Sequence, residues 1–257
     1  MFYLTGFHLT SAHINRLAKL TRMAPWPGTE KPLLNPHNMQ KLPLNTAVLS
    51  KSPSEQDLQQ ILSLSPTAVI DVNALDSSIQ EFLQKLDAIK NKNKLGFLLT
   101  CPVIYACNVA QNITHTLQQF IILPSEQQES IHFALHESIV NGLIHGNLQI
   151  NSSMRQSARD FIEYARLLHD RLNDPSYAQK SISVIATWNA KKLEIKIRDE
   201  GAGYGTTTNP IRHSSTMQHK TGRGIRIIAG AADSCTIEDF GREITLSFLL
   251  QDHPIQK

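Results

Sequence analysis

The sequence has little of several features that would fix its class at once. Its three cysteines are an odd number without metal-ligand spacing, so we expect buried or inactive thiols in a reducing cytoplasm. A net charge of +3 gives no reason to expect nucleic acid or an anionic membrane as partner. No apolar run approaches the roughly 18 residues of a membrane span, and the N-terminus lacks signal-peptide features. These absences favour a cytoplasmic protein.

The 257 residues are enough for one large domain or two ordinary ones. In the first half, short apolar runs alternate with amphipathic stretches, which predicts a parallel sheet with helices on both faces. A Pro-rich segment, 25–43, cannot be regular throughout. The predicted strands are 2–5, 46–49, 68–72, 96–99 and 120–123. The predicted helices are 11–22, 54–64, 77–90 and 103–117.

Five strands in this pattern resemble a flavodoxin-like domain of the response-regulator receiver type, over residues 1–124. Receivers hold Mg²⁺ with an acidic pair after the first strand, where this chain has Gly-Phe-His at 6–8, and Leu123 stands where they carry a lysine. Asp71 ends the third predicted strand, at the phosphoacceptor position. Without the acids and the lysine, nothing offsets the charge of a transferred phosphoryl group. We therefore expect a degenerate receiver used for binding or dimerisation, with Asp71 capping a loop.

Three motifs follow in the second half. The first lies on a predicted helix that ends at Gly146-Asn147, where Glu137 and Asn141 are four residues apart and share one face, with His145 four further on. A carboxylate and an amide at this spacing can serve as a general base and a metal-holding oxygen. In isolation, such a pair is more often a solvated polar stripe.

The second motif is a strand whose apolar residues alternate over 193–197 and whose end carries Asp199, Gly201 and Gly203. Such an acid can accept a hydrogen bond from an exocyclic amine such as that of adenine, and the glycines allow the backbone to approach a ligand. A plain hairpin turn would show the same sequence pattern.

The third motif is a glycine-rich helix start, which can bind an anion or simply join a loop to a helix. It comprises Thr221, Gly222, Arg223 and Gly224.

In this order the three motifs resemble the N box, G1 box and G2 box of the GHKL ATPases, over about residues 126–250. The resemblance implies a two-layer α/β sandwich that binds ATP and Mg²⁺. It implies that Glu137 activates the attacking hydroxyl or water and that Asn141 binds Mg²⁺. By the same resemblance, Asp199 binds the adenine amine, Gly201 and Gly203 shape the pocket, and the third motif contacts the phosphates. Residues 204–219 would form the ATP lid.

One departure is visible in the late strand, where many GHKL proteins have Gly-Thr and this chain has Gly241-Arg242. This puts one contact on the adenine side in doubt. An insertion at about 148–180, with an amphipathic helix at 157–172, separates the first motif from the next strands. The predicted domains are thus 1–124 and 125–257, with the insertion in the second.

Within the superfamily, the motifs look most like anti-sigma-factor serine kinases. That resemblance implies a regulatory kinase that phosphorylates an antagonist protein of the STAS type and binds a sigma factor or another regulator. By analogy with the family, homodimerisation is also expected. A non-catalytic ATP-responsive binding module and a simple ATPase are the alternatives. Retention of Glu137 favours catalysis mildly, because binding alone needs no base.

Overall fold

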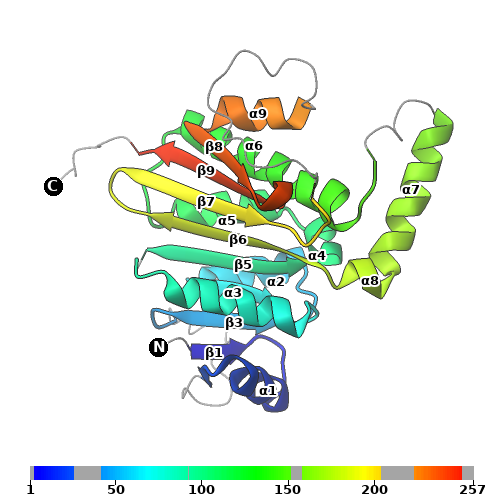
Figure 1. Cartoon of the computed structure of the whole chain (residues 1–257). Helices are drawn as coiled ribbons and strands as arrows, with labels where there is room; N and C mark the ends of the chain where they lie inside the picture. The colour runs from blue at the N-terminus through cyan, green and yellow to red at the C-terminus, as the bar shows by residue number, and fades with distance from the viewer. Residues whose placement is uncertain (1–2, 26–41, 92, 152–157, 204–222, 251–257) are drawn as a thin grey trace.

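One mixed sheet runs through the protein, in the strand order β2-β1-β3-β4-β5-β6-β7-β9-β8 (Figure 1). The computed structural model describes residues 3–25, 42–91, 93–151, 158–203 and 223–250. Within these ranges the chain has an α/β fold with helices packed on the sheet. No helix in the described part is long and apolar enough to cross a membrane.

The first half of the chain forms the parallel part of the sheet, whose order β2-β1-β3-β4-β5 is that of flavodoxin-like sheets. Its strands are β1 (Tyr3–Gly6), β2 (Ala24–Pro25), β3 (Thr46–Ser50), β4 (Ala68–Asp71) and β5 (Lys94–Thr100). Every residue of β3, β4 and β5 is buried, as expected where helices cover both faces. One face packs on α1 (Ser11–Thr21) and α3 (Asp76–Ala88). The other packs on α2 (Glu55–Ser63), α4 (Cys101–Ala106) and α5 (Val109–Leu117).

Four of the five predicted strands are confirmed, and the fifth is wrong. Residues 120–123 form a turn after α5, in which the Phe120 amide donates to the Leu117 carbonyl. Phe120 and Ile122 are 45% and 74% exposed, so this apolar run is not a core strand. The missing strand is instead β2, two residues at the start of the Pro-rich segment. The remainder of that segment, 26–41, lies outside the described residues.

The second half continues the same sheet in antiparallel fashion. Along its full length β5 pairs with β6 (Ser181–Trp188), from Lys94 opposite Thr187 to Thr100 opposite Ser181. The remaining strands are β7 (Lys192–Arg198), β8 (Ser234–Glu238) and β9 (Glu243–Leu249). The helices on this part are α6 (Ser125–Asn141), the π-helix η1 (Gly142–Asn147) and α9 (Arg223–Ala231). The predicted boundary at 124/125 therefore falls between two halves that share one sheet, and it stays a prediction.

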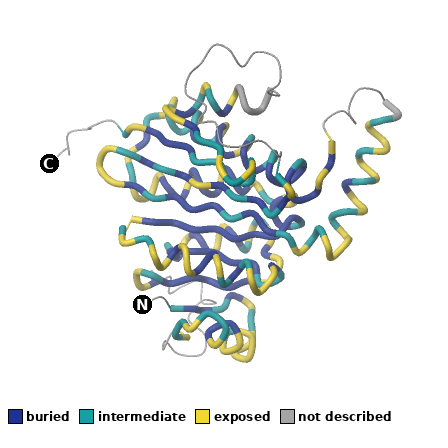
Figure 2. Tube along the Cα trace, in the orientation of Figure 1, coloured by how far each residue is buried: buried dark blue, intermediate teal, exposed yellow. Residues whose placement is uncertain are grey.

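Over β7, β8 and β9, the described helices cover one face of the sheet. Leu193, Ile195 and Ile197 of β7 are buried on that face, while the residues between them are partly or fully exposed (Figure 2). Alternation of this kind is typical of an antiparallel sheet with one solvated face. The predicted two-layer arrangement of this part is confirmed, in contrast to the three layers formed by the first half.

The predicted insertion contains α7 (Ala158–Asn173) and α8 (Pro175–Ala178). Figure 1 shows α7 extending away from the sheet. Its C-terminal half is anchored, because Leu168 is buried and the Arg171 guanidinium donates to the Leu148 carbonyl. Phe161, near its other end, is 61% exposed. The helix predicted at 157–172 is thus confirmed.

Candidate functional site

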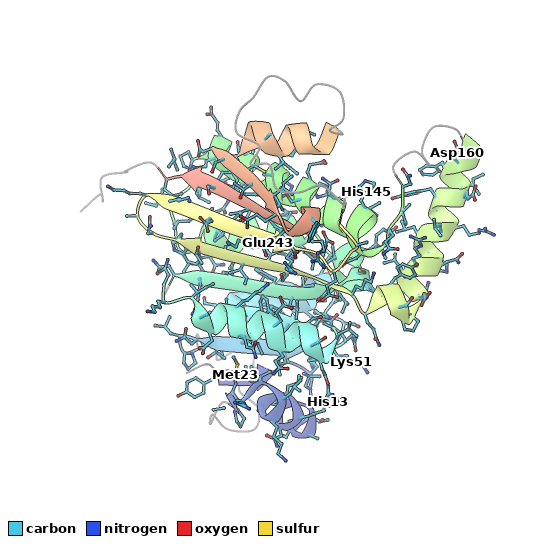
Figure 3. The ribbon with its side chains drawn as sticks, viewed as in Figure 1. His13, Met23, Lys51, His145, Asp160 and Glu243 are labelled. Atoms are coloured by element: carbon cyan, nitrogen blue, oxygen red, sulfur yellow. The ribbon has the colours of Figure 1, made fainter. Side chains whose placement is uncertain are left out.

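The first motif lies on α6 and on the wide π turn that follows it. At the end of this turn the Leu148 amide bonds to the Leu143 carbonyl at 2.8 Å, five residues back. Such wide turns occur often at functional sites. The turn takes His145 off the regular helical spacing from Asn141, and its Nδ1 lies 2.7 Å from the Ile150 carbonyl (Figure 3). His145 therefore helps to end the helix and does not extend the polar face of Glu137 and Asn141.

Two glycines of the π-helix make room for Asp199, which follows β7. A Cβ atom at Gly146 would lie 2.5 Å from the Asp199 carboxyl carbon, and one at Gly142 would lie 3.4 Å from the Asp199 Cβ. Any side chain at 146 would thus displace the carboxylate. The glycine expected only to end the helix is required for close contact between the first two motifs.

Asp199 is 7% exposed, and one of its oxygens is already used. Oδ1 accepts a hydrogen bond from the Gly201 amide at 2.7 Å, whereas Oδ2 accepts none from the described residues. Burial raises the pKa of Asp199 to about 6, although the Gly201 amide and the nearby Arg242 charge oppose the shift. A buried carboxylate with a free acceptor oxygen fits the expected role of receiving a hydrogen bond from a ligand amine.

Asn147 fixes the turn that carries Asp199, and sequence reasoning missed this role. Its side chain is fully buried; Oδ1 accepts from the Glu200 amide at 2.7 Å and Nδ2 donates to the Ser181 carbonyl at 2.9 Å. The Glu200 carboxylate accepts in turn from the amide and hydroxyl of Ser181. This closed set of hydrogen bonds joins the end of the first motif to β6 and to the second motif. The sequence places Asn147 at a helix end but does not indicate these distant hydrogen-bond partners.

A narrow cleft of about 40 Å³ brings the first two motifs together on the helix-covered face of the sheet. Asn141 and Asp199 both line it, and the structure thus confirms that these two predicted residues meet. Glu137, one turn before Asn141 and half-buried, is not among the lining residues. The other lining residues are Ser138, Gly142, Ile197, Ile228, Ile237, Gly241, Arg242 and Ile244.

The donor set suits a magnesium ion shared with phosphates. The Asn141 side chain makes no hydrogen bond to a described residue, so its amide oxygen is available as a hard ligand. No group of three or more His, Cys, Asp or Glu residues in the described ranges could hold a metal. Magnesium fits such a place, because it is usually held by one or two protein ligands together with water and substrate phosphates.

The predicted glycines after Asp199 lie in close contact with other backbone. A Cβ at Gly201 would meet the Gly146 carbonyl oxygen at 2.4 Å, which ties this turn to the first motif. Gly203 has a φ of +75°, and a Cβ there would meet the Phe240 carbonyl oxygen at 2.5 Å. Both positions therefore require glycine for steric reasons.

Arg242 stands beside Asp199, at the position where the GHKL resemblance leads us to expect threonine. Its carbonyl accepts the Asp199 amide at 3.0 Å, and its guanidinium bonds to the Asp239 carboxylate at 2.5 Å. The arginine is thus held by a neighbouring acid rather than by Asp199.

The third motif is only partly described. Thr221, Gly222 and the predicted lid, 204–219, lie outside the described residues. Arg223 and Gly224 form the first turn of α9, as the sequence predicts, and α9 packs against α6. The contacts of these four residues with a ligand stay a prediction.

The candidate residue of the first half has a structural role. Asp71 is fully buried; its Oδ1 accepts from the amides of Ser52 and Asn73, and its Oδ2 from the Thr100 hydroxyl at 2.5 Å. It therefore caps the loops at this sheet edge, as expected. Because β2 precedes it, Asp71 ends the fourth strand and not the third, so it does not stand where a receiver carries its phosphoacceptor.

Comparison with known proteins agrees with this geometry. Residues 105–248, more than half of the chain, match the profile of the histidine kinase-like ATPase domain. The matched range includes α6, η1 and the strands β6 to β9, and it begins within α4, before the predicted boundary. No curated protein matches the chain significantly.

Proposed function

The chain belongs to the histidine kinase-like ATPase family, and on that premise we propose that it is an ATP-binding regulatory protein serine/threonine kinase of the anti-sigma-factor type. Membership of the family implies ATP binding and a kinase or ATPase activity. The observation that carries the proposal is the convergence of Asn141 and Asp199 on one cleft, with Glu137 one turn away on the same helix.

In this proposal the adenine amine donates to the free Oδ2 of Asp199, and Gly201 and Gly203 let the backbone close around the base. Asn141 would hold Mg²⁺, which when bound offsets the charge on the phosphates. Glu137 takes the proton of the attacking hydroxyl. The third motif, from Thr221 to Gly224, would contact the phosphates.

The substrate we propose is a serine or threonine of a STAS-type antagonist protein, and phosphorylation would decide whether the kinase holds a sigma factor or another regulator. Residues 1–124 would form a degenerate receiver-like domain that takes its input from another protein. The order β2-β1-β3-β4-β5 supports that assignment.

A non-catalytic, ATP-responsive binding module is the second candidate. It is favoured by one observation: Glu137 does not line the cleft that Asn141 and Asp199 share within the described residues. In that case the nucleotide shifts partner affinity without phosphoryl transfer.

Replacing the proposed base separates the two candidates. The full-length protein is incubated with Mg-ATP and STAS-type proteins, and phosphate incorporation is measured for the wild type and for Glu137→Gln. We expect transfer to fall by about 10²–10⁴-fold while ATP affinity is unchanged, because the base acts only on the reacting hydroxyl.

Glu129→Gln is the matched control, since Glu129 is an exposed glutamate two turns earlier on α6. It should leave transfer unchanged. If no STAS-type protein is phosphorylated, yet ATP alters partner binding equally in the wild type and in Glu137→Gln, the binding module is correct and the kinase is not.

A further inference from the structure

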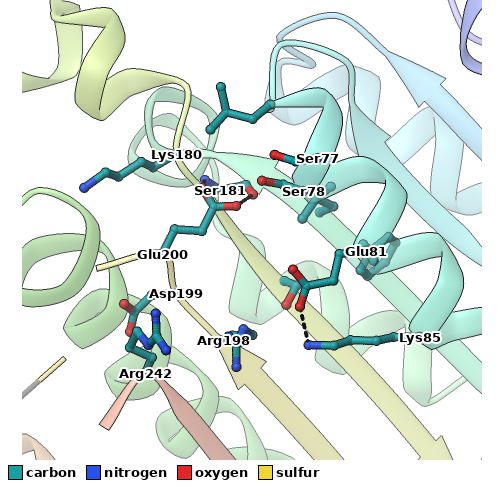
Figure 4. Close-up of a pocket in the computed structure, with 14 residues that line it drawn as sticks. Ser77, Ser78, Glu81, Lys85, Lys180, Ser181, Arg198, Asp199, Glu200 and Arg242 are labelled. Atoms are coloured by element: carbon teal, nitrogen blue, oxygen red, sulfur yellow. Dashed lines mark hydrogen bonds and ion pairs between the residues drawn. The ribbon is translucent and has the colours of Figure 1, made fainter. Parts of the chain in front are cut away.

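A second and larger cleft, of about 340 Å³, lies on the other face of the sheet from the predicted nucleotide site (Figure 4). Its walls are α3, from the first half of the chain, and strands β5, β6 and β7. Its volume is in the range of small-molecule sites. Asp199 and Arg242 line both clefts, so the two are neighbours across the sheet edge.

The carboxylates around this cleft already have protein donors. Glu200 receives both the amide and the hydroxyl of Ser181, and Glu81 pairs with Lys85 at 2.8 Å. Asp199 receives the Gly201 amide. Glu200 thus has both oxygens occupied by Ser181, whereas Asp199 keeps Oδ2 without a donor from the described residues.

The cations keep unused donors. Arg198 contacts both Asp239 and Glu243 through the single nitrogen Nη1, and its Nε and Nη2 donate to no described residue. Arg242 uses Nε and Nη2 for Asp239, which leaves Nη1. Only 26% and 33% of these two side chains are exposed, so the free N–H groups are held in the cleft wall rather than in bulk water.

Hydroxyl and amide groups add further unused hydrogen-bond donors to this cleft. Within the described residues, the hydroxyls of Ser77, Ser78 and Ser183 make no hydrogen bond, and Figure 4 shows those of Ser77 and Ser78 directed into the cleft. Both serines are in the first turn of α3, whose N-cap residue Leu75 offers no capping side chain. The first-turn amides of a helix have no partner within the helix and favour anions.

We propose that this cleft binds a small phosphate-bearing molecule, held between the Arg198 guanidinium and the serines at the start of α3. Guanidinium groups bind phosphate through paired N–H donors, and the hydroxyls supply further donors to its oxygens. A ligand held there contacts both halves of the chain and lies beside Asp199, which makes the cleft suited to carry an input to the nucleotide site.

The test uses inorganic phosphate, the full chain and no nucleotide, so it does not depend on the proposed kinase activity. Amide shifts of Ser77 and Ser78 are followed by NMR during the titration. We expect saturable shifts in the wild type and at least about tenfold weaker affinity in Ser78→Asp, because a carboxylate there repels the anion. The same substitution favours the helix start electrostatically, so the protein should remain folded.

Gln56→Asp is the matched control: it adds the same charge to the first turn of α2, at an exposed residue outside the cleft. It should leave phosphate affinity unchanged. Equal affinity in the wild type and Ser78→Asp would overturn the proposal, as would shifts confined to residues on the α6 face such as Gly142.

Discussion

Two buried aspartates at strand ends behave differently in this protein. Asp71, after β4, accepts three hydrogen bonds and has both oxygens occupied. Asp199, after β7, accepts one hydrogen bond from the described residues, which leaves its Oδ2 without a donor among them, and burial raises its pKa. Burial combined with an unfilled hydrogen-bonding capacity is characteristic of a ligand site, whereas burial with full capacity is characteristic of structure. At this edge Asp71 of the first half holds loops together, whereas Asp199 of the second half presents a carboxylate oxygen to a cleft.

The largest effect should come from the saturated aspartate. Asp71→Ala leaves two amides and the Thr100 hydroxyl without an acceptor, so we expect the free energy of unfolding to fall by about 2–5 kcal/mol. ATP affinity should be unchanged, because Asp71 does not line the nucleotide cleft. Urea denaturation followed by circular dichroism measures the free energy of unfolding, and calorimetry measures ATP affinity. Asp87→Ala, at an exposed position of α3, should cost little.

Replacing Asp199 should raise the free energy of unfolding, whereas replacing Asp71 lowers it. Because the folded-state pKa of Asp199 is raised to about 6, the native state binds its proton more tightly than the unfolded chain, and stability falls as pH rises from about 4 to about 6. Asp199→Asn removes this penalty. We expect up to about 3 kcal/mol higher unfolding free energy at pH 7.5, shrinking to near zero below pH ~4. A difference that does not depend on pH would contradict the assigned cause.

The smallest expected effects on the free energy of unfolding come from substitutions at two glycines. Gly146→Ala forces a methyl group onto Asp199, and we expect a loss of about 1–3 kcal/mol in unfolding free energy together with weaker ATP binding. Gly230→Ala, in α9, meets no atom within 4 Å and should be neutral or stabilise the protein by up to about 1 kcal/mol. If thermal unfolding shows equal shifts for both variants, close packing at Gly146 is not what holds Asp199.

Local patterns predicted most of the elements and named two of the residues that line the first cleft, Asn141 and Asp199. The strands from β3 to β5 are continuous apolar runs, and β7 alternates, so burial alone determines them. The strand β2 could not be predicted, because two residues, one of them a proline, carry no periodicity. The strand predicted at 120–123 was wrong because an apolar run does not reveal that two of its side chains, Phe120 and Ile122, are exposed.

What sequence could not supply was the set of contacts between distant segments. The pairing of β5 with β6 joins residues about eighty positions apart and merges the two halves into one sheet. The bonds from Asn147 to Ser181 and Glu200 span 34 and 53 positions. The second cleft combines α3 with Arg198 and Arg242, which no single motif contains. Such features depend on topology, and topology is not encoded in local spacing.

The central claim, that Asp199 serves a nucleotide while Asp71 serves the fold, is tested most directly by calorimetry with Mg-ATP. The account predicts saturable binding by the wild type and by Asp71→Asn, and affinity weaker by about 10–100-fold in Asp199→Asn, because a hydrogen bond to a charged acceptor is lost. Equal affinity in all three proteins, or no binding by the wild type, would contradict it.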